Sequence, residues 1–265
     1  MTTQKLHGTS GLLSAATAAR KQMLMEIIGC KMYIARAVQY DSLTAVCKLA
    51  SEQATATEAT WEKALHLLAY DMAHLDPRIV FRADGMILHG YCDASFMSEG
   101  RAKSRGGDFT YLGRPYPTAP NGAIEPHSSI LPMTPTSAGQ AEHGELFEFT
   151  KDIVAQRQLL EWMGYPQPTQ PGTPIYEDNA ATFEIAHKAV KQRRSKHWAM
   201  RHHYTQELQE QGIIDVTKID GADQLADYFT KNNPPKLHSE RTPKFVQYIA
   251  TQETSIGAEK ILKNG

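Results

Sequence analysis

The sequence predicts an α/β fold in which a mixed five-stranded sheet is flanked by helices and preceded by a small helical segment. Two observations carry the prediction. Apolar residues alternate as in strands between about residues 77 and 131, and from residue 138 helical patterns alternate with short apolar strands. Before residue 77 the apolar residues repeat with the period of a helix. Strands first and alternating strands and helices later are typical of a mixed sheet covered by helices.

The chain divides into three predicted regions: a disordered start with a helical linker (1–76), an α/β domain (77–235) and a polar tail (236–265). Helix-period positions mark the linker, and Asp76-Pro77 ends it. The expected apolar stripes are Met23, Ile27, Cys30, Ile34 and Val38, then Trp61, Leu65, Leu68 and Met72.

The composition excludes some classes of protein. The 265 residues carry a formal net charge of −1, so any affinity for nucleic acid must come from a local patch. Three cysteines without a CxxC pair indicate a reducing, intracellular compartment, cytoplasmic or nuclear, and no structural zinc. No apolar run has the length of a membrane span, and we expect no membrane partner.

The domain is expected to begin with a hairpin. Asp84-Gly85 separates a strand at Ile79–Phe81 from a strand at Met86–Ser95. Alternation places Asp93 on the face that carries Tyr91. Taken alone, Asp93 also fits a turn residue that bonds its own backbone. Further strands are expected at Phe109–Leu112 and about 123–131, after a loop that contains Arg101–Arg105.

Helices and strands alternate in the second half. The predicted elements are a long helix at about Ala138–Met163, a strand at Pro174–Asp178, a helix at Ala180–Val190 capped by Asn179, a helix at about Trp198–Gln211, a strand at Ile213–Ile219 and a last helix at Ala222–Lys231.

Three further acids lie in or beside these elements. Glu142 is four residues before Leu146 on the apolar stripe of the long helix and should face the sheet, with Glu145 as its rival. Asp178 ends a strand, where it also fits a helix cap. Asp227 is expected inside the last helix, four residues after Asp223, and like charges at that spacing repel.

Together with Asp93, these acids indicate a site for hard cations. Mg²⁺ or Mn²⁺ prefers oxygen ligands, and two such ions can activate a water and stabilise the leaving oxygen of a phosphodiester. Basic residues gather elsewhere, at Lys188, Lys191, Arg193, Arg194, Lys196 and Arg201, with Arg105 in a second basic loop. Such a patch can hold a phosphate backbone, and it also fits a solvated connection between helices.

Several motifs together resemble the ribonuclease H domain of copia-type LTR-retrotransposon polyproteins, with part of the linker that follows the polymerase. They are YCDAS (91–95), SRGGDFTYLG (104–113), TSAGQAEHGEL (136–146), IYEDNAA (175–181), RRSKHWAMRHHY (193–204) and DQLADYFTK (223–231). The resemblance covers about residues 25–235. It departs from the family at QAEH, where the family has an EAEY-like motif, but it keeps the glutamate.

The resemblance implies a function. Asp93, Glu142, Asp178 and Asp227 match the family's acids, which would bind two Mg²⁺ or Mn²⁺ ions and hydrolyse the RNA strand of an RNA–DNA hybrid. His203 matches a histidine of an RYH-like motif, although it also fits a surface residue. The polymerase portion of a parent polyprotein is an expected partner.

Two other functions stay open. One is an inactive remnant that keeps the fold as a binding or structural module, and the other is an integrase-like nuclease that cuts DNA. The four acids argue against the first, and their combination with LADYFTK argues against the second. No YxDD polymerase motif is present, so this chain alone is not expected to synthesise DNA.

Overall fold

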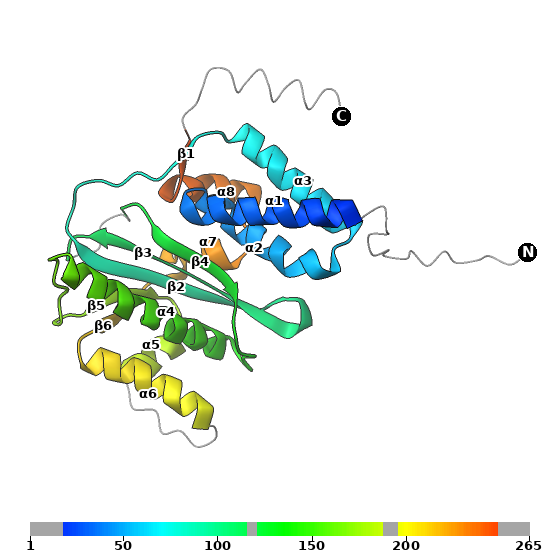
Figure 1. Ribbon diagram of the computed structural model, residues 1–265. Helices are drawn as coiled ribbons and strands as arrows, with labels where there is room; N and C mark the ends of the chain where they lie inside the picture. Colours follow the sequence, from blue (N-terminus) through cyan, green and yellow to red (C-terminus); the bar gives the residue numbers. More distant parts are fainter. Residues whose placement is uncertain (1–17, 116–120, 188–195, 249–265) are drawn as a thin grey trace, which may run out of the picture. The chain divides into compact units, whose positions relative to one another are not determined.

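The structure is a computed structural model that describes residues 18–115, 121–187 and 196–248, without the side chains of 18 and 196–199 (Figure 1). The described residues form two compact units, one of residues 18–77 with Tyr248 and the other within residues 78–247. The expected disordered start, residues 1–17, lies outside the described residues. None of the helices in the described ranges combines the length and the apolar character needed to cross a membrane.

The first unit is helical, with α1 (Ala18–Ala37), α2 (Leu43–Glu52) and α3 (Glu58–Ala73). The predicted stripes were wrong in phase. On α1 the buried residues include Leu24 and Ile28, whereas Met23 is 51% exposed. On α3 they include Ala64 and Leu67, next to the expected Leu65 and Leu68. A neighbouring residue can satisfy the same period, so the spacing predicts a helix better than it predicts its buried face.

The second unit is built on five strands and helices on both sides of the sheet. The strands are β2 (Ile87–Glu99), β3 (Lys103–Gly113), β4 (Ile124–Ile130), β5 (Thr173–Glu177) and β6 (Ile214–Lys218). The helices are α4 (Ala138–Trp162), α5 (Ala180–His187), α6 (Lys196–Glu210), α7 (Asp227–Thr230) and α8 (Pro235–Arg241). The two-residue strands β1 (Pro77–Arg78) and β7 (Gln247–Tyr248) lie outside this sheet.

The five-stranded sheet has the order β4-β3-β2-β5-β6. β2 pairs antiparallel with β3, and β3 with β4, while β2–β5 and β5–β6 are parallel. The predicted mixed five-stranded sheet flanked by helices is confirmed. The parallel part follows from the chain order, because the long helix α4 carries the chain back before β5 begins.

The two faces of the sheet are packed differently. On one face α4 lies along β2 (Figure 1), and Leu146, Phe149 and Ile153 form an apolar core with Leu88 and Cys92. The other face is aromatic: the ring of Tyr91 stacks with those of Phe109 and Tyr111 and lies tilted beside that of Tyr176, and Phe229 and Phe245 pack against Phe109. Alternation along β2 separates the two faces, as the sequence predicts.

The start of the domain differs from the prediction. Residues 79–86 are not a strand, so the expected hairpin at Asp84-Gly85 was wrong. The hairpin is instead the one between β2 and β3, which closes through a short helical turn at Gly100–Ala102. β2 therefore runs past Asp93 to Glu99, and the basic residues expected in a loop lie in the turn and at the start of β3.

The end of the domain also differs. The expected helix Ala222–Lys231 is a 3-10 turn at Gly221–Asp223 followed by the short helix α7. Asp227 is consequently the first residue of α7, and Asp223 is outside that helix. The predicted tail begins with α8, and Phe245 and Val246 are buried, so the sheet unit extends to Gln247. The helix predicted at 180–190 is described to His187 only.

Replacing Gly90 should destabilise the core between β2 and α4. A Cβ on Gly90 would lie 2.5 Å from two ring atoms of Phe149, so Gly90→Ala must push the ring or bend the strand. We expect a loss of about 1–3 kcal/mol in the free energy of unfolding, measured by urea titration. Gly100→Ala is the control, because no atom lies within 4 Å of its Cβ position. Equal stability of both variants would contradict this packing.

Candidate metal centre

Strand register brings Asp93 and Asp178 together. β2 and β5 run parallel with Tyr91 opposite Tyr176. Each aspartate lies two residues beyond its tyrosine, so both lie at the level where β5 ends and on the same side of their strands. Asp93 is 2% exposed, whereas Asp178, just after β5, is half-buried. The neighbouring Asn179 accepts hydrogen bonds from the N–H groups of Ala181 and Thr182, so the predicted cap at this position is confirmed.

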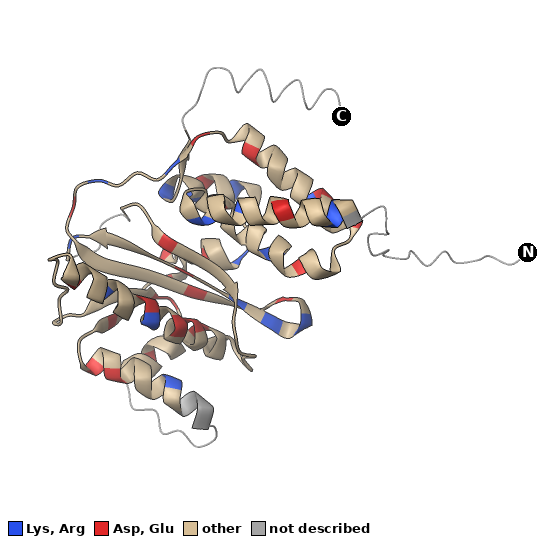
Figure 2. Ribbon diagram, in the orientation of Figure 1, with Lys and Arg blue, Asp and Glu red and all other residues tan. Residues whose placement is uncertain are grey.

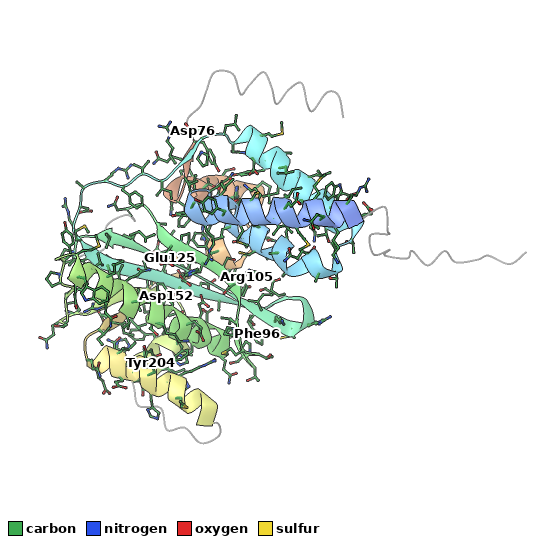
Figure 3. All side chains as sticks on the ribbon, viewed as in Figure 1. Asp76, Phe96, Arg105, Glu125, Asp152 and Tyr204 are labelled. Atoms are coloured by element: carbon green, nitrogen blue, oxygen red, sulfur yellow. The ribbon has the colours of Figure 1, made fainter. Side chains whose placement is uncertain are left out.

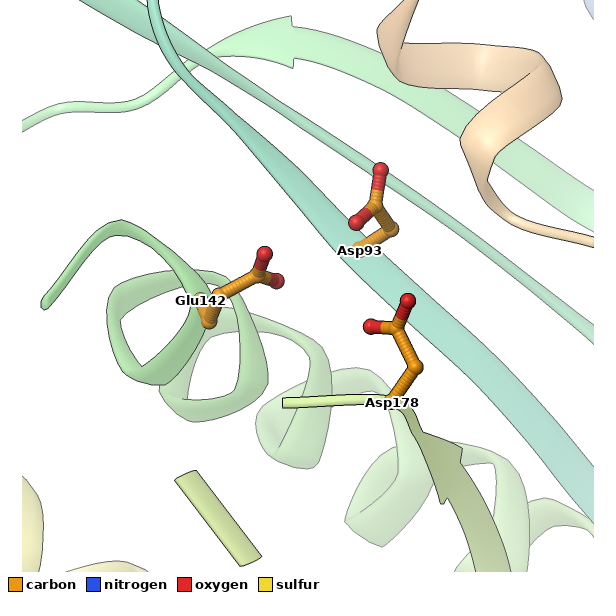
Figure 4. Close-up of side chains that lie close together, drawn as sticks. All are labelled: Asp93, Glu142 and Asp178. Atoms are coloured by element: carbon orange, nitrogen blue, oxygen red, sulfur yellow. The ribbon is translucent and has the colours of Figure 1, made fainter. Parts of the chain in front are cut away.

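The first turns of α4 add Glu142. The helix begins after Ser137, whose side chain accepts a hydrogen bond from the Gln140 N–H. Glu142 is 8% exposed, and its Oε2 accepts a 2.8 Å hydrogen bond from the backbone N–H of Ala94. One ligand atom each from Asp93, Glu142 and Asp178 lies within 4.8 Å of the others (Figure 4). Three carboxylates from three distant parts of the chain therefore converge, and we call them the acid triad.

Burial and mutual repulsion disfavour the charged forms of the triad. Burial, followed by the charge of Asp227, raises the pKa of Asp93 to about 7. Burial also raises the pKa of Glu142 to about 10, with further contributions from Glu177 and Asp93. The pKa of Asp178 is raised by burial and by Asp227. A divalent cation would offset this repulsion, because carboxylate oxygens are its preferred ligands.

Asp227 lies beside the triad rather than within it. Its carboxylate contacts two cations: Oδ1 accepts a hydrogen bond from Lys231 Nζ, and Oδ2 is 3.9 Å from Arg241 Nη1. The charge of Asp227 still helps to raise the pKa of Asp93 and of Asp178. Next to it, the buried Thr230 hydroxyl donates a hydrogen bond to Asp93 Oδ2. Of the four predicted acids, the structure thus groups three and places the fourth against them.

Glu145, the rival of Glu142, belongs to a different cluster. Its carboxylate lies over Gly106, where a Cβ would clash with it, and next to Asp108. Burial raises its pKa well above the ordinary value, and the neighbouring Asp108 adds to the shift. Asp108 in turn lies 3.2 Å from His127 Nδ1. Glu142, and not Glu145, is the glutamate of the triad.

Three further residues contribute to this centre, and none of them was predicted from the sequence. Glu177 is fully buried behind Asp178, and burial raises its pKa to about 8. The Gln224 side chain donates to the carbonyl oxygen of Cys92 and so ties the segment before α7 to β2. Gly221 leaves space for Asp178, whose Oδ2 would be 3.1 Å from a Cβ there. Of the three, only Glu177 could have been noticed in the sequence, because it is an acid within an otherwise apolar strand.

The predicted basic surface is only partly described. Lys191, Arg193 and Arg194 lie outside the described residues, as does the Lys196 side chain. Arg201 packs against Phe147, with its guanidinium 5.2 Å from the ring centre, and contacts Met133. His203 is exposed on α6 and is not part of the triad.

Arg105 corrects the prediction of a basic loop that binds nucleic acid. Figure 2 shows basic residues at the turn between β2 and β3, but Arg105, labelled in Figure 3, is 1% exposed. Its Nε donates a 2.7 Å hydrogen bond to Glu99 Oε1, and Nη1 donates to Ser128. The side chain of Arg105 points inward from its strand. It therefore forms a buried ion pair with Glu99 and is not placed to contact a phosphate.

The sequence is similar to a retrotransposon polyprotein. Over 176 residues, 66% of this chain, it is 26% identical to the retrovirus-related Pol polyprotein from transposon TNT 1-94 of Nicotiana tabacum. The match spans 12% of that polyprotein's length. No family model matches the chain. The predicted resemblance to such polyproteins is confirmed.

Solved structures similar to this one are ribonucleases H. A ribonuclease H1 isolated from compost has 10% identity and a TM-score of 0.40 over 58% of this chain and 97% of its own. Ribonuclease H1 of Halobacterium salinarum has 14% identity and a TM-score of 0.34, over 59% of this chain and 97% of its own. The N-terminal ribonuclease H domain of a Mycobacterium tuberculosis protein has 12% identity and a TM-score of 0.38, over 59% of this chain and 97% of its own.

The metal-free protein should lose stability as the pH rises. Unfolded Asp93 loses its proton near its ordinary pKa of 3.8, whereas the folded state keeps it up to about 7. Between these values the folded state binds more protons, so the free energy of unfolding falls with rising pH. Urea titrations in EDTA at pH 4.5 and 7.5 measure this fall.

Substitution at Asp93 should reduce that fall. We expect a smaller loss between the two pH values in Asp93→Asn, because the group that releases the proton is gone. Glu210→Gln, which removes an exposed carboxylate of α6, should behave as wild type. A wild-type protein that gains stability over this pH interval, or an Asp93→Asn variant with an unchanged loss, would show that burial and the neighbouring charge do not raise the pKa of Asp93 as described.

Proposed function

We propose that the chain is a metal-dependent endonuclease that hydrolyses the RNA strand of RNA–DNA hybrids as part of a retrotransposon polyprotein. The convergence of Asp93, Glu142 and Asp178 carries this proposal. Nothing in the packing of the sheet requires three carboxylates at one edge, and their proximity has a cost that a cation offsets. The ribonuclease H-like strand order and the similarity to a Pol polyprotein support the same function.

The donor set fits Mg²⁺ or Mn²⁺. All three triad atoms are carboxylate oxygens, and there is no thiolate or imidazole among them, which would favour a softer ion. Asp227, beside the triad, would help to hold a second ion. Such ions, when bound, supply an activated water and stabilise the leaving oxygen of the phosphodiester.

The residues of the chain itself hold the site in shape. The Ala94 N–H fixes the Glu142 carboxylate, and the Thr230 hydroxyl fixes that of Asp93. Both partners donate hydrogen bonds, so they favour the charged forms that bind cations. The triad is therefore oriented by neutral groups that do not compete for the metal, as donors around first ligands commonly do.

The proposed substrate is an RNA–DNA hybrid. Ribonucleases of this kind would need to contact two phosphate backbones and to sense RNA 2′-hydroxyls, because shape rather than sequence distinguishes a hybrid. We assign the backbone contacts to Lys191, Arg193, Arg194 and Lys196, between α5 and the start of α6. The polymerase portion of a parent polyprotein is the proposed partner that delivers the hybrid.

Cleavage of labelled duplexes tests the proposal. With Mg²⁺ the full chain should cut the RNA strand of a hybrid, leave 3′-hydroxyl ends and spare double-stranded DNA. Asp93→Asn should lower the rate more than about 100-fold, since loss of a direct ligand should exceed the roughly 10- to 100-fold effect of losing a group that only hydrogen-bonds to a ligand. Glu210→Gln should keep the wild-type rate. Equal cutting of duplex DNA would indicate an integrase-like nuclease, and no cutting of either substrate would indicate an inactive module.

A further inference from the structure

Lys231 places a positive charge against the acid triad. It follows α7 directly, and its side chain is about half exposed, so the ammonium group reaches the site from the solvent side. Nζ donates a hydrogen bond to Asp227 Oδ1 and lies 3.9 Å from Asp93 Oδ2. One lysine thus faces both the first acid of the triad and the acid beside it.

Asp227 is held between two cations. Arg241 of α8 lies 3.9 Å from the second oxygen of Asp227, and its Nη1 also donates a 3.2 Å hydrogen bond to the Gln224 carbonyl oxygen. Arg241 is anchored in this way and its side chain is only 12% exposed, whereas that of Lys231 is 51% exposed. Lys231 is therefore the partner that can withdraw from Asp227 without unpacking the protein.

We propose that Lys231 is an intrinsic counter-ion that makes divalent-cation binding stepwise, first at the acid triad and then at Asp93 and Asp227 once Nζ has left. The inference rests on the proposed function for its role in hydrolysis, but its effect on metal binding is separate. Lys231 and a second divalent cation compete for the same two carboxylates, and like charges cannot share them closely without a large cost.

The charges around the site explain why the steps differ. The site carries four negative charges when Asp93, Glu142, Asp178 and Asp227 are all ionised. Lys231 and Arg241 contribute two positive charges. One divalent cation then brings this group to neutrality. A second divalent cation gives an excess of positive charge, which a substrate phosphate can reduce. We therefore expect the second cation to bind more tightly when a phosphodiester is present.

Mn²⁺ binding measures the two steps without any cleavage. We would titrate the full chain with MnCl₂, following heat by calorimetry and free Mn²⁺ by electron paramagnetic resonance. The variants are Lys231→Met, which keeps the stem and removes the charge, Lys231→Arg, which keeps the charge, and Asp227→Asn, which removes the shared ligand. Lys236→Met, an exposed lysine of α8, is the matched control. Circular dichroism confirms that each variant is folded.

Wild type and Lys236→Met should bind one Mn²⁺ tightly and a second weakly. Lys231→Met should tighten the second site by about tenfold or more, the effect of removing one charge at close range in a partly solvated site. Lys231→Arg should resemble wild type, and Asp227→Asn should lose the second site. A second site that is unchanged in Lys231→Met, or two equally tight sites in wild type, would overturn the inference.

The result is independent of the proposed hydrolysis. If no variant cleaves a hybrid but Lys231→Met still tightens the second site, then the proposed function fails and the counter-ion role stands. If wild type cleaves while the Mn²⁺ isotherms of wild type and Lys231→Met coincide, then the function stands and the counter-ion role fails. A short single-stranded DNA added as an uncleaved phosphate source should tighten the second site of wild type more than that of Lys231→Met.

Discussion

The convergence of buried carboxylates, whose charged forms are disfavoured first by burial and then by one another, is the constraint on which this structure depends. The parallel register of β2 and β5 places Asp93 beside Asp178, and α4 brings Glu142 to the same edge. Fixed donors from Ala94 and Thr230 orient two of these acids without neutralising them. The charges of Lys231 and Arg241 lie on the side of Asp227. The neighbourhood of the triad thus fixes the positions of the acids, although burial disfavours their charged forms.

The apolar core below the site gives this arrangement its rigidity. Phe149 and Ile153 of α4 pack on β2 at Gly90, which fixes the height of the helix above the sheet and so the reach of Glu142. The same buried environment raises the pKa of Glu145 one turn later, with Asp108 as the neighbouring acid of largest effect. The two glutamates differ in what they face: Glu142 accepts a hydrogen bond from the Ala94 N–H and meets Asp93 and Asp178, whereas Glu145 lies over Gly106.

Much of the fold could be predicted because its signals are local. The stripe of α4, the Asn179 cap and the alternation along β2 depend on neighbours within a few residues. Features set by tertiary contacts could not be predicted in this way. Arg105 is a basic residue that strand pairing buries against Glu99. The helix α7 is shorter than the predicted helix Ala222–Lys231, because Gln224 bonds to β2 instead of lying within a helix. The roles of Glu177 and Lys231 emerge only when distant segments meet.

The central claim is that the acid triad is a divalent-cation site. A crystal structure of the full chain grown with MnCl₂ tests it most directly, because the anomalous signal of manganese locates the ion without reference to activity. We expect a peak within about 2.0–2.4 Å of oxygens from Asp93, Glu142 and Asp178, the range between the bond lengths of Mg²⁺ and Ca²⁺. A saturating Mn²⁺ concentration that leaves no anomalous peak at the triad, with its carboxylates turned apart, would contradict the account.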